Sequence, residues 1–420
     1  MKEQLKIAIV GLGYVGLPLL RLFSNKFNTI GYDINENRIN LLKKGIDSTN
    51  ELDSRSLKNL IFTNEANDLS DCNVYIITVP TPVNEDKIPD LNPIKSATTL
   101  VSRYVNKDNV VIFESTVYPG CTEEICVPII EDISKLKLND SFYVGYSPER
   151  IVPGDKINTI EKIVKVTSGS NSYSSKFVDD LYKQIIDAGT FRASSIKVAE
   201  ASKAIENAQR DLNISFVNEL SIIFSNLEIE TTEVIEAAST KWNFHNYKPG
   251  LVGGHCIGVD PYYLTYKSIK EGYIPDVILS GRKVNESMGE RIVSFIIKKL
   301  LARDYNIKNL NVLILGFTFK ENCPDIRNTG VNNLRNAFKQ YAFSIDIYDP
   351  YADQEETYQE YDFRLIEEKQ LKNSKYDVVV LAVAHNQFSE LEPRSLLKNE
   401  NGIVYDIKTF FKKNKSDYRL

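Results

Sequence analysis

The 420-residue sequence predicts an α/β protein with two Rossmann-like parallel-sheet domains joined by a long central helix. Apolar, β-branched runs alternate with helical patterns in the N-terminal part of the chain and again after residue 300, which is typical of βαβ units. Between them, residues 195–227 contain neither proline nor glycine. We therefore expect an N-terminal α/β domain over 1–193, a central helical region over 194–300 and a smaller α/β domain over 301–420.

The expected strands of the two sheets are short runs with turn residues around them. In the N-terminal domain they are LKIAIV (5–10), NTIGYD (28–33), CNVYIITV (72–79), NVVIFEST (109–116) and FYVGYS (142–147). In the C-terminal domain they are LNVLILGF (310–317), FSIDIYD (343–349), YDVVVLAVA (376–384) and GIVYDI (402–407).

The central stretch predicts an amphipathic helix of unusual length for a globular domain. Its apolar residues step by three and four along the chain: Ala201, Ile205, Ala208, Leu212, Phe216, Leu220, Ile223 and Leu227. Lys203, Asn207 and Arg210 form a polar stripe on another face. Taken alone, that stripe is better explained by a solvated surface than by a site.

Composition limits the classes of partner and site. Apolar residues make up 42% of the chain, which is enough for a sizeable core, and the net charge of −5 without a long basic run argues against nucleic acid. The apolar start is too short to span a membrane, and we expect no secretory signal. Five cysteines without a CxxC pair and three histidines indicate a reducing, cytoplasmic setting with neither disulfides nor a metal site.

The segment GLGYVG follows the first expected strand and opens a helix. In that context Gly11 permits the tight turn, Gly13 lets a pyrophosphate approach the backbone, and Gly16 lets the helix pack on the strand. Asp33 ends the next strand, where a carboxylate accepts hydrogen bonds from a ribose hydroxyl and repels a 2′-phosphate. The pattern predicts a dinucleotide site that prefers NAD to NADP, although the nearby Arg38 weakens that preference.

The segment GLVGGHCIGVDPYY places Cys256 between a glycine pair and Asp260. A structural cysteine usually lies in an apolar core, whereas glycines allow a ligand to come close to the backbone. This setting is compatible with a reactive thiol as well as with a structural cysteine, and the rest of the sequence has to decide between these two interpretations.

Seven motifs in order give the chain a resemblance to the UDP-glucose/GDP-mannose dehydrogenase family. They are the three glycines of GLGYVG, TVPTP, ESTVYPG, SPER, the Lys203–Asn207 pair, GGHCIGVD and GFTFKENCPDIRNT. Within the family, GGHCIGVDPYYL and the preceding FHNYKPGL resemble the branch that acts on UDP-N-acetylhexosamines. The glucose-type loop carries an arginine that reaches a neighbouring subunit, and the stretch TKWNFHNYKPG gives no basis for carrying it over.

The resemblance implies an N-terminal NAD-binding domain, a dimerisation helix with a substrate loop, and a C-terminal UDP-sugar-binding domain, in a homodimer. It implies a four-electron oxidation of the sugar C6 alcohol to a carboxylate with two NAD. Cys256 matches the family nucleophile, which forms a thiohemiacetal and then a thioester. Lys203 and Asn207 match the groups that stabilise the sugar oxygen, and Asp260, Thr116 and Glu149 share the handling of water and protons.

The resemblance also implies the binding residues. The cofactor residues are Gly11, Gly13, Tyr14, Val15, Gly16, Asp33, Arg38, Pro80, Thr81, Thr116 and Arg327. The substrate residues are Glu149, Arg150, Lys203, Asn207, Tyr247, Lys248, Gly253 and Lys320. The family often has a basic residue before the Ser-Thr of STVYPG, where this chain has Glu114, and the sequence does not predict the effect of that difference.

Several alternatives remain at this point. The sugar is expected to be UDP-N-acetylglucosamine, for a surface polysaccharide, but UDP-N-acetylmannosamine, UDP-N-acetylgalactosamine and UDP-glucose stay open. A two-electron hydroxyacid dehydrogenase shares the N-terminal fold and a helix lysine but has no need of Cys256. A non-catalytic NAD- or nucleotide-sugar-binding protein has no need of Lys203, Asn207, Cys256 and Asp260 together.

Overall fold

The computed structural model describes residues 5–84, 86–151, 157–254 and 257–420. The chain forms two compact units. The first unit comprises Met1–Glu206 with Tyr262–Tyr273, and the second comprises Asn207–Pro261 with Ile274–Leu420. Along the described part of the chain, no helix combines the length and the apolar character that a membrane span requires.

The first unit is built on an eight-stranded sheet with the order β3-β2-β1-β4-β5-β6-β7-β8. All five strands predicted for this unit are present and pair in parallel, namely β1 (Lys6–Val10), β2 (Asn28–Tyr32), β4 (Val74–Ile77), β5 (Val110–Phe113) and β6 (Tyr143–Tyr146). Their apolar side chains are buried on both faces, as is usual in a parallel sheet. The predicted fold class is confirmed.

Three short strands of this sheet lie outside the predicted set: β3 (Phe62–Thr63), β7 (Lys165–Gly169) and β8 (Thr190–Arg192). Strand β7 runs antiparallel to β6, and β8 pairs with β7 in parallel. The sequence KVTSG of β7 lacks the apolar pattern of a buried strand. Its polar residues can be buried because their side chains form hydrogen bonds within the protein. Thr167 Oγ1 donates to Asp179 at 2.9 Å, and Ser168 Oγ donates to the Tyr146 carbonyl at 2.7 Å.

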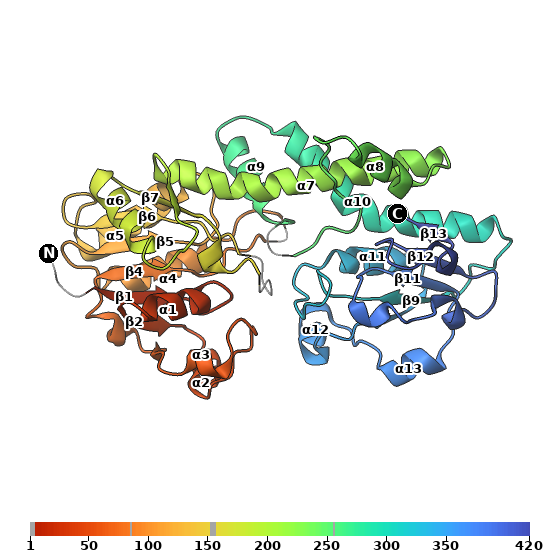
Figure 1. Cartoon of the computed structure of the whole chain (residues 1–420), viewed down its shortest axis with the longest axis horizontal. Coiled ribbons are helices and arrows are strands. Elements are labelled where there is room, and N and C mark those ends of the chain that lie inside the picture. Colours follow the sequence, from red (N-terminus) through yellow and green to blue (C-terminus); the bar gives the residue numbers. More distant parts are fainter. Residues whose placement is uncertain (1–4, 85, 152–156, 255–256) are drawn as a thin grey trace. The chain divides into compact units, whose positions relative to one another are not determined.

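Helices flank this sheet, as Figure 1 shows. Their apolar sides meet a core that includes Ile7, Leu20, Phe23 and Ile112. The helices of this unit are α1 (Gly16–Ser24), α2 (Glu36–Lys43), α3 (Ser54–Leu57), α4 (Asn92–Ser102), α5 (Val127–Ser134) and α6 (Ser172–Tyr182); α9 (Asp260–Lys270) starts in the second unit and continues here.

The predicted central helix is α7 (Ile196–Asn226), which has 31 residues. It is drawn as one continuous helix in Figure 1. Part of its apolar face is exposed in the isolated chain. Ile205, Phe216 and Ile223 are 56%, 56% and 44% exposed, and Leu227 just beyond the helix is 60% exposed. Their spacings of 11, 7 and 4 residues place them on one side of the helix.

The second unit contains a five-stranded parallel sheet with the order β10-β9-β11-β12-β13. Its four predicted strands are confirmed as β9 (Asn311–Leu315), β10 (Ser344–Tyr348), β11 (Val378–Leu381) and β12 (Ile403–Asp406), and a fifth, β13 (Tyr418–Arg419), ends the sheet. The helices are α8 (Thr231–Ser239), α10 (Asp276–Leu301), α11 (Gly330–Lys339), α12 (Gln354–Tyr361) and α13 (Glu368–Asn373).

Helix α10 packs closely on α11. A Cβ added at Gly289 of α10 would lie 2.8 Å from the Leu334 nitrogen of α11, so the two backbones approach as only glycine allows. Met288, Ile292 and Phe338 belong to the core between α10 and the sheet. Helix α10 of the central region therefore shares one core with α11 and the sheet of the second unit.

Candidate active site

The glycine turn after β1 has the geometry that its sequence predicts. Gly11 has a φ of +98°, and its N–H donates to the Tyr32 carbonyl at 2.8 Å. A Cβ at Gly16 would lie 1.8 Å from the Gly11 carbonyl oxygen, so helix α1 can start only from a glycine. A Cβ at Gly13 would meet nothing within 4 Å, and the glycine is exposed. The turn thus leaves an open face at the N-terminus of α1, where Tyr14 and Val15 precede the helix and the pyrophosphate of a dinucleotide fits.

Asp33 closes the same turn from the end of β2. Its Oδ2 accepts the Leu12 N–H at 2.8 Å and its Oδ1 accepts the Asn35 N–H at 2.9 Å. Each carboxylate oxygen has a further lone pair, which leaves capacity for a ribose hydroxyl. Arg38 is 8% exposed; its Nε donates to the Leu12 carbonyl at 3.0 Å, and it forms an ion pair with Asp47 at 2.8 Å. Arg38 therefore braces the turn from within, and the charge of its guanidinium is already paired.

The loops after β4 and β5 are tied to each other. Thr81 Oγ1 donates to the Thr116 carbonyl at 2.6 Å, and Ser115 Oγ donates to the Val79 carbonyl at 2.6 Å. The hydroxyl of the buried Tyr263 donates to the Thr81 carbonyl, and Pro80 is exposed beside it. The structure thus brings Thr81 and Thr116, which the sequence predicted separately, to one edge of the sheet.

Glu149 and Arg150 of SPER follow β6. Glu149 is 8% exposed, and its Oε1 accepts the Ile151 N–H, while its Oε2 is buried with no hydrogen-bond partner among the described residues. A buried carboxylate oxygen without a partner calls for a ligand or a water molecule. Arg150 pairs with Glu206 of α7 at 2.6 Å, three residues after Lys203, so the SPER loop is fixed to the helix that carries Lys203.

A buried lysine that the sequence analysis did not single out lies beside Glu114. Lys165 of β7 pairs with Glu114 at 2.6 Å and also donates to the Pro148 carbonyl of SPER at 3.1 Å. The Tyr182 hydroxyl donates to the second oxygen of Glu114. Burial raises the pKa of Glu114, and Lys165 opposes that effect. A buried cation therefore does lie behind the strand-end loops, on β7 instead of in the motif itself.

Glu200 of α7 joins the helix to the N-terminal end of the segment that leads into α5. Its carboxylate accepts the N–H groups of Gly120 at 2.5 Å and Thr122 at 2.9 Å, and it is 0% exposed. Burial raises the pKa of Glu200 to about 7. A carboxyl with a raised pKa binds protons more tightly in the folded than in the unfolded chain.

We expect Glu200 to make stability depend on pH near neutrality. Its contribution to the free energy of unfolding is fully present below the unfolded pKa of about 4.5 and is lost as the pH rises through about 7, by about 3 kcal/mol at most. Glu200→Gln should therefore flatten the fall in melting temperature between pH 5 and pH 8. Glu219→Gln, at an exposed position of α7, is the matched control. Equal pH slopes for native protein and Glu200→Gln would contradict this assignment.

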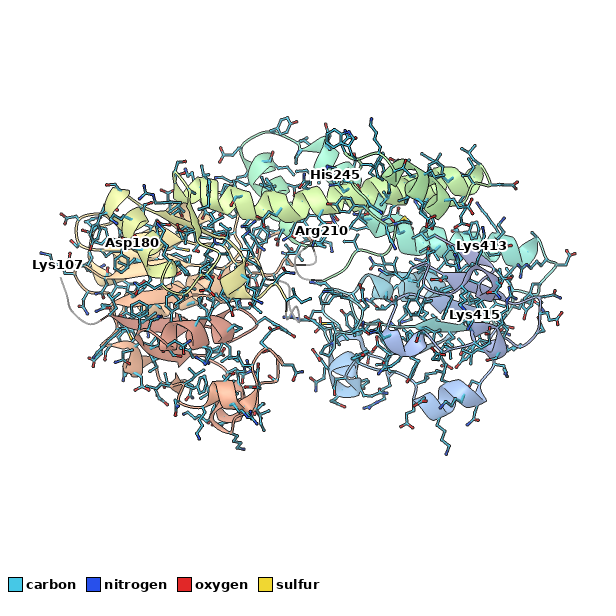
Figure 2. The ribbon with its side chains drawn as sticks, in the orientation of Figure 1. Lys107, Asp180, Arg210, His245, Lys413 and Lys415 are labelled. Carbon is cyan, nitrogen blue, oxygen red and sulfur yellow. The ribbon has the colours of Figure 1, made fainter. Side chains whose placement is uncertain are left out.

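Helix α7 carries the polar stripe of the sequence analysis. Lys203 is 6% exposed and Asn207 is partly buried, whereas Arg210, labelled in Figure 2, is exposed. In the second unit, Asn207 Nδ2 donates to Asp260 Oδ2 at 2.5 Å, and Asp260 is 2% exposed at the first residue of α9. The solvated-surface interpretation therefore holds for Arg210 alone.

The loop before α9 is held against the β9 end of the second unit. The Gly254 N–H donates to the Asn328 carbonyl at 3.0 Å, and a Cβ at Gly253 would lie 2.6 Å from the Gly330 nitrogen. Tyr247 is partly buried and Lys248 is exposed. Cys256, the predicted nucleophile, lies outside the described residues.

The loop after β9 carries Lys320 and Arg327. Arg327 makes a two-point contact with the buried Asp325, from Nε at 3.0 Å and from Nη2 at 2.5 Å, so its guanidinium is held in one orientation. The ring of His385, which is fully buried, accepts the Asn322 N–H through Nδ1 at 3.0 Å and lies 3.0 Å from Asp349 through Nε2. His385 and Asp349 therefore hold this loop against the ends of β10 and β11, and the sequence analysis singled out neither residue.

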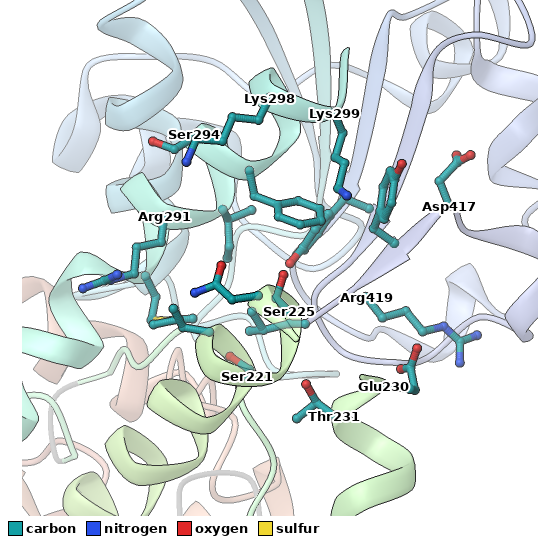
Figure 3. Close-up of a pocket in the computed structure, with 18 of the residues that line it drawn as sticks. Ser221, Ser225, Glu230, Thr231, Arg291, Ser294, Lys298, Lys299, Asp417 and Arg419 are labelled. Carbon is teal, nitrogen blue, oxygen red and sulfur yellow. The ribbon is translucent and has the colours of Figure 1, made fainter. Parts of the chain in front are cut away.

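A cavity of 1240 Å³ in the second unit is separate from these residues (Figure 3). Figure 3 shows Ser225, Arg291, Lys299 and Asp417 around it, from the end of α7, from α10 and from the C-terminal segment. Its lining includes none of the described residues that the sequence predicted as site residues. The cavity is therefore not part of the predicted active site.

Comparison with known proteins gives one family for the whole chain. Its NAD binding domain matches residues 5–186, its central domain matches 197–287 and its UDP binding domain matches 313–413. The chain belongs to the UDP-glucose/GDP-mannose dehydrogenase family. It is therefore an NAD-dependent oxidoreductase, and the open face at Gly13 belongs to the family's NAD-binding domain.

Relatives of this dehydrogenase extend over its full length. It is 49% identical to UDP-N-acetyl-D-glucosamine 6-dehydrogenase of Salmonella typhi, with 100% of this chain and 99% of the relative covered. It is also 49% identical to the enzyme of the same name from Pseudomonas aeruginosa, with 100% of both chains covered. Among solved structures, the UDP-D-ManNAc dehydrogenase from Pyrococcus horikoshii superposes with a TM-score of 0.89 at 26% identity, covering 99% of this chain and 98% of that one.

Proposed function

We propose that this dehydrogenase oxidises the C6 alcohol of a UDP-N-acetylhexosamine, foremost UDP-N-acetylglucosamine, to the uronic acid. The observation that carries the proposal is the 49% identity, over the whole chain, to two proteins named for that substrate. The structure named for the mannosamine epimer is only 26% identical, so UDP-N-acetylmannosamine is the second candidate. In this proposal the product serves a surface polysaccharide and the enzyme works in the cytoplasm.

The predicted site residues divide the chemistry. Bound NAD supplies a hydride acceptor, and Gly11, Gly13, Gly16 and Asp33 would hold it. In this proposal Lys203 and Asn207 stabilise the negative charge that develops on the sugar oxygen. The C6–H bond breaks in the first oxidation and the hydroxyl proton leaves, which gives an aldehyde.

The second oxidation needs a nucleophile, because an aldehyde has no suitable hydride to lose until something adds to its carbon. In this proposal the thiolate of Cys256 adds to that carbon, and the thiohemiacetal loses the second hydride to become a thioester. Water then cleaves the carbon–sulfur bond, which returns the thiolate and releases the carboxylate. Asp260, Glu149 with its unpartnered Oε2, and Thr116 are the groups that we assign to that water and its proton.

The stoichiometry of the reaction tests this function. We expect two NADH per molecule of limiting UDP-N-acetylglucosamine, measured by absorbance. We also expect a lower kcat/KM for UDP-N-acetylmannosamine, UDP-N-acetylgalactosamine and UDP-glucose. One NADH per sugar would contradict the four-electron oxidation. A higher kcat/KM for another UDP-sugar would make that sugar the preferred substrate.

We also propose that the active form is a homodimer in which a second copy covers the exposed stripe of α7. Ile205, Phe216, Ile223 and Leu227 form an apolar row that a partner helix of the same sequence would bury. The central region 194–300 would then be the dimerisation region between an NAD-binding domain (1–193) and a UDP-sugar-binding domain (301–420). The three matched family domains support that division.

Replacing Phe216 with glutamate is expected to give a monomer, because a charge in a buried apolar interface costs several kcal/mol. Light scattering after size-exclusion chromatography would measure the mass. Ile61→Glu, at a position that is 55% exposed in the first unit, is the control and should remain dimeric. A native protein that is monomeric, or a Phe216→Glu variant that is still dimeric, would contradict this interface.

A further inference from the structure

Asn218 of α7 is a buried amide that holds Gly250 by both of its backbone polar groups. The Gly250 N–H donates to Asn218 Oδ1 at 2.8 Å, and Asn218 Nδ2 donates to the Gly250 carbonyl at 3.0 Å. Asn218 is 0% exposed. An amide that pairs with the N–H and the C=O of one residue fixes that backbone as a neighbouring strand would. Gly250 stands six residues before Cys256.

The orientation of the Asn218 amide is set by two further buried groups. The Asp211 carboxylate and carbonyl can only accept hydrogen bonds, so Asn285 must present its Nδ2, which donates to Asp211 O at 3.0 Å and to Oδ1 at 2.8 Å. Asn285 Oδ1 then faces Asn218 and accepts its Nδ2 at 2.8 Å. Asn218 Oδ1 is left for the Gly250 N–H. The direction of every bond in this series follows from the carboxylate at its start.

The series is anchored in an ion pair between α7 and α10. Arg282 Nη1 lies 2.7 Å from Asp211 Oδ1, and the two side chains are 7% and 0% exposed. Asp211 Oδ1 carries both the Arg282 and the Asn285 contacts, while its Oδ2 is buried with no hydrogen-bond partner among the described residues. Breaking a link in such a buried charged network leaves a further polar group uncompensated. Disrupting this network should therefore cost more free energy than disrupting a surface contact.

The loop is held a second time just before the predicted nucleophile. Gly254 donates to the Asn328 carbonyl at 3.0 Å, and its φ of +81° is one that few other residues adopt. The backbone is thus fixed at Gly250 by the central helices and at Gly254 by the loop after β9. Both fixed points lie within the second unit.

We propose that Asn218, oriented by Asn285 and Asp211, is a positioning residue that sets the backbone from which Cys256 attacks the sugar aldehyde. The inference rests on the proposed function, since it gives Cys256 its role. A misplacement of about 1 Å in a reacting group can lower a rate about 100-fold, so a device that fixes this backbone has a measurable effect.

Asn218→Asp tests the inference because it preserves shape and changes only the donors. An ionised carboxylate cannot donate to the Gly250 carbonyl or to Asn285, whereas a protonated one donates a single bond. We expect kcat for UDP-sugar oxidation to fall about tenfold or more at pH 8.5, and the variant-to-native ratio of kcat to recover as the pH falls towards 6. The KM for NAD should stay within about twofold, because the NAD-binding domain is untouched.

Asn213→Asp is the matched control, since this amide lies on the same helix and, within the described part of the chain, donates to the Gln209 carbonyl one turn earlier. If Asn218→Asp fails to fold, Asn218→Thr carries the test: a lowered kcat without recovery at low pH is then expected. If Asn218→Thr, or Asn218→Asp at every pH, has the native kcat while Cys256→Ala is inactive, this inference is wrong but the proposed mechanism stands. A fully active Cys256→Ala would overturn the proposed mechanism and the inference with it.

Discussion

Cys256→Ala is expected to abolish sustained four-electron oxidation, with kcat for acid formation lowered by about 1,000-fold or more. Without the thiolate no thiohemiacetal forms, and the aldehyde carbon has no hydride to give in the second step. The variant should still bind NAD and UDP-sugar with affinities close to native, because the glycine turn and the β9 loop are unchanged. Product analysis by mass spectrometry and NADH absorbance would measure the loss.

The control for this variant is Cys72→Ala. Cys72 is buried in the first unit, where burial raises the pKa of its thiol to about 11, so it is not a thiolate at neutral pH. Cys72→Ala should therefore keep native activity. Two NADH per sugar from Cys256→Ala would exclude the thioester route and return a two-electron or water-based mechanism to consideration.

The fold could be predicted from the sequence where burial and apolar character coincide. Strands β1, β4, β5 and β9 consist mainly of Ile, Val and Leu and are buried on both faces, so an apolar run in the sequence indicates a buried strand there. Strand β7 could not be predicted because Lys165 and Thr167 are buried by virtue of partners at Glu114 and Asp179, which lie 51 and 12 residues away. The local pattern of apolar and polar residues does not indicate such distant partners.

The same limit applies to the site. Gly11, Gly16 and Asp33 act through the backbone around them, and their roles could be read from local spacing. Asn218 and His385 act on loops 32 and 63 residues away, and by type alone each would be taken for a surface residue. The exposed apolar residues of α7 show the opposite case. Their spacing predicts a buried face, but in the isolated chain Ile205, Phe216 and Ile223 are exposed.

Two glycines of the turn, Gly13 and Gly16, are expected to respond differently to alanine, although the motif requires both. Gly16→Ala should destabilise the first unit by about 3 kcal/mol or more, because its Cβ would overlap the Gly11 carbonyl oxygen at 1.8 Å and Thr78 Oγ1 at 2.5 Å. Gly13→Ala should leave the melting temperature nearly unchanged, because its Cβ would project into open space.

The open space at Gly13 is the space that a pyrophosphate would enter, so the same methyl group that the fold tolerates should exclude the cofactor. We expect the Kd for NAD in Gly13→Ala to rise about tenfold or more, which is about 1.4 kcal/mol, with UDP binding unchanged. Isothermal titration with NAD and with UDP separates the two effects on one folded protein. Native NAD affinity in Gly13→Ala would mean that the dinucleotide does not cross this turn. A native melting temperature in Gly16→Ala would mean that α1 can start without the close contact.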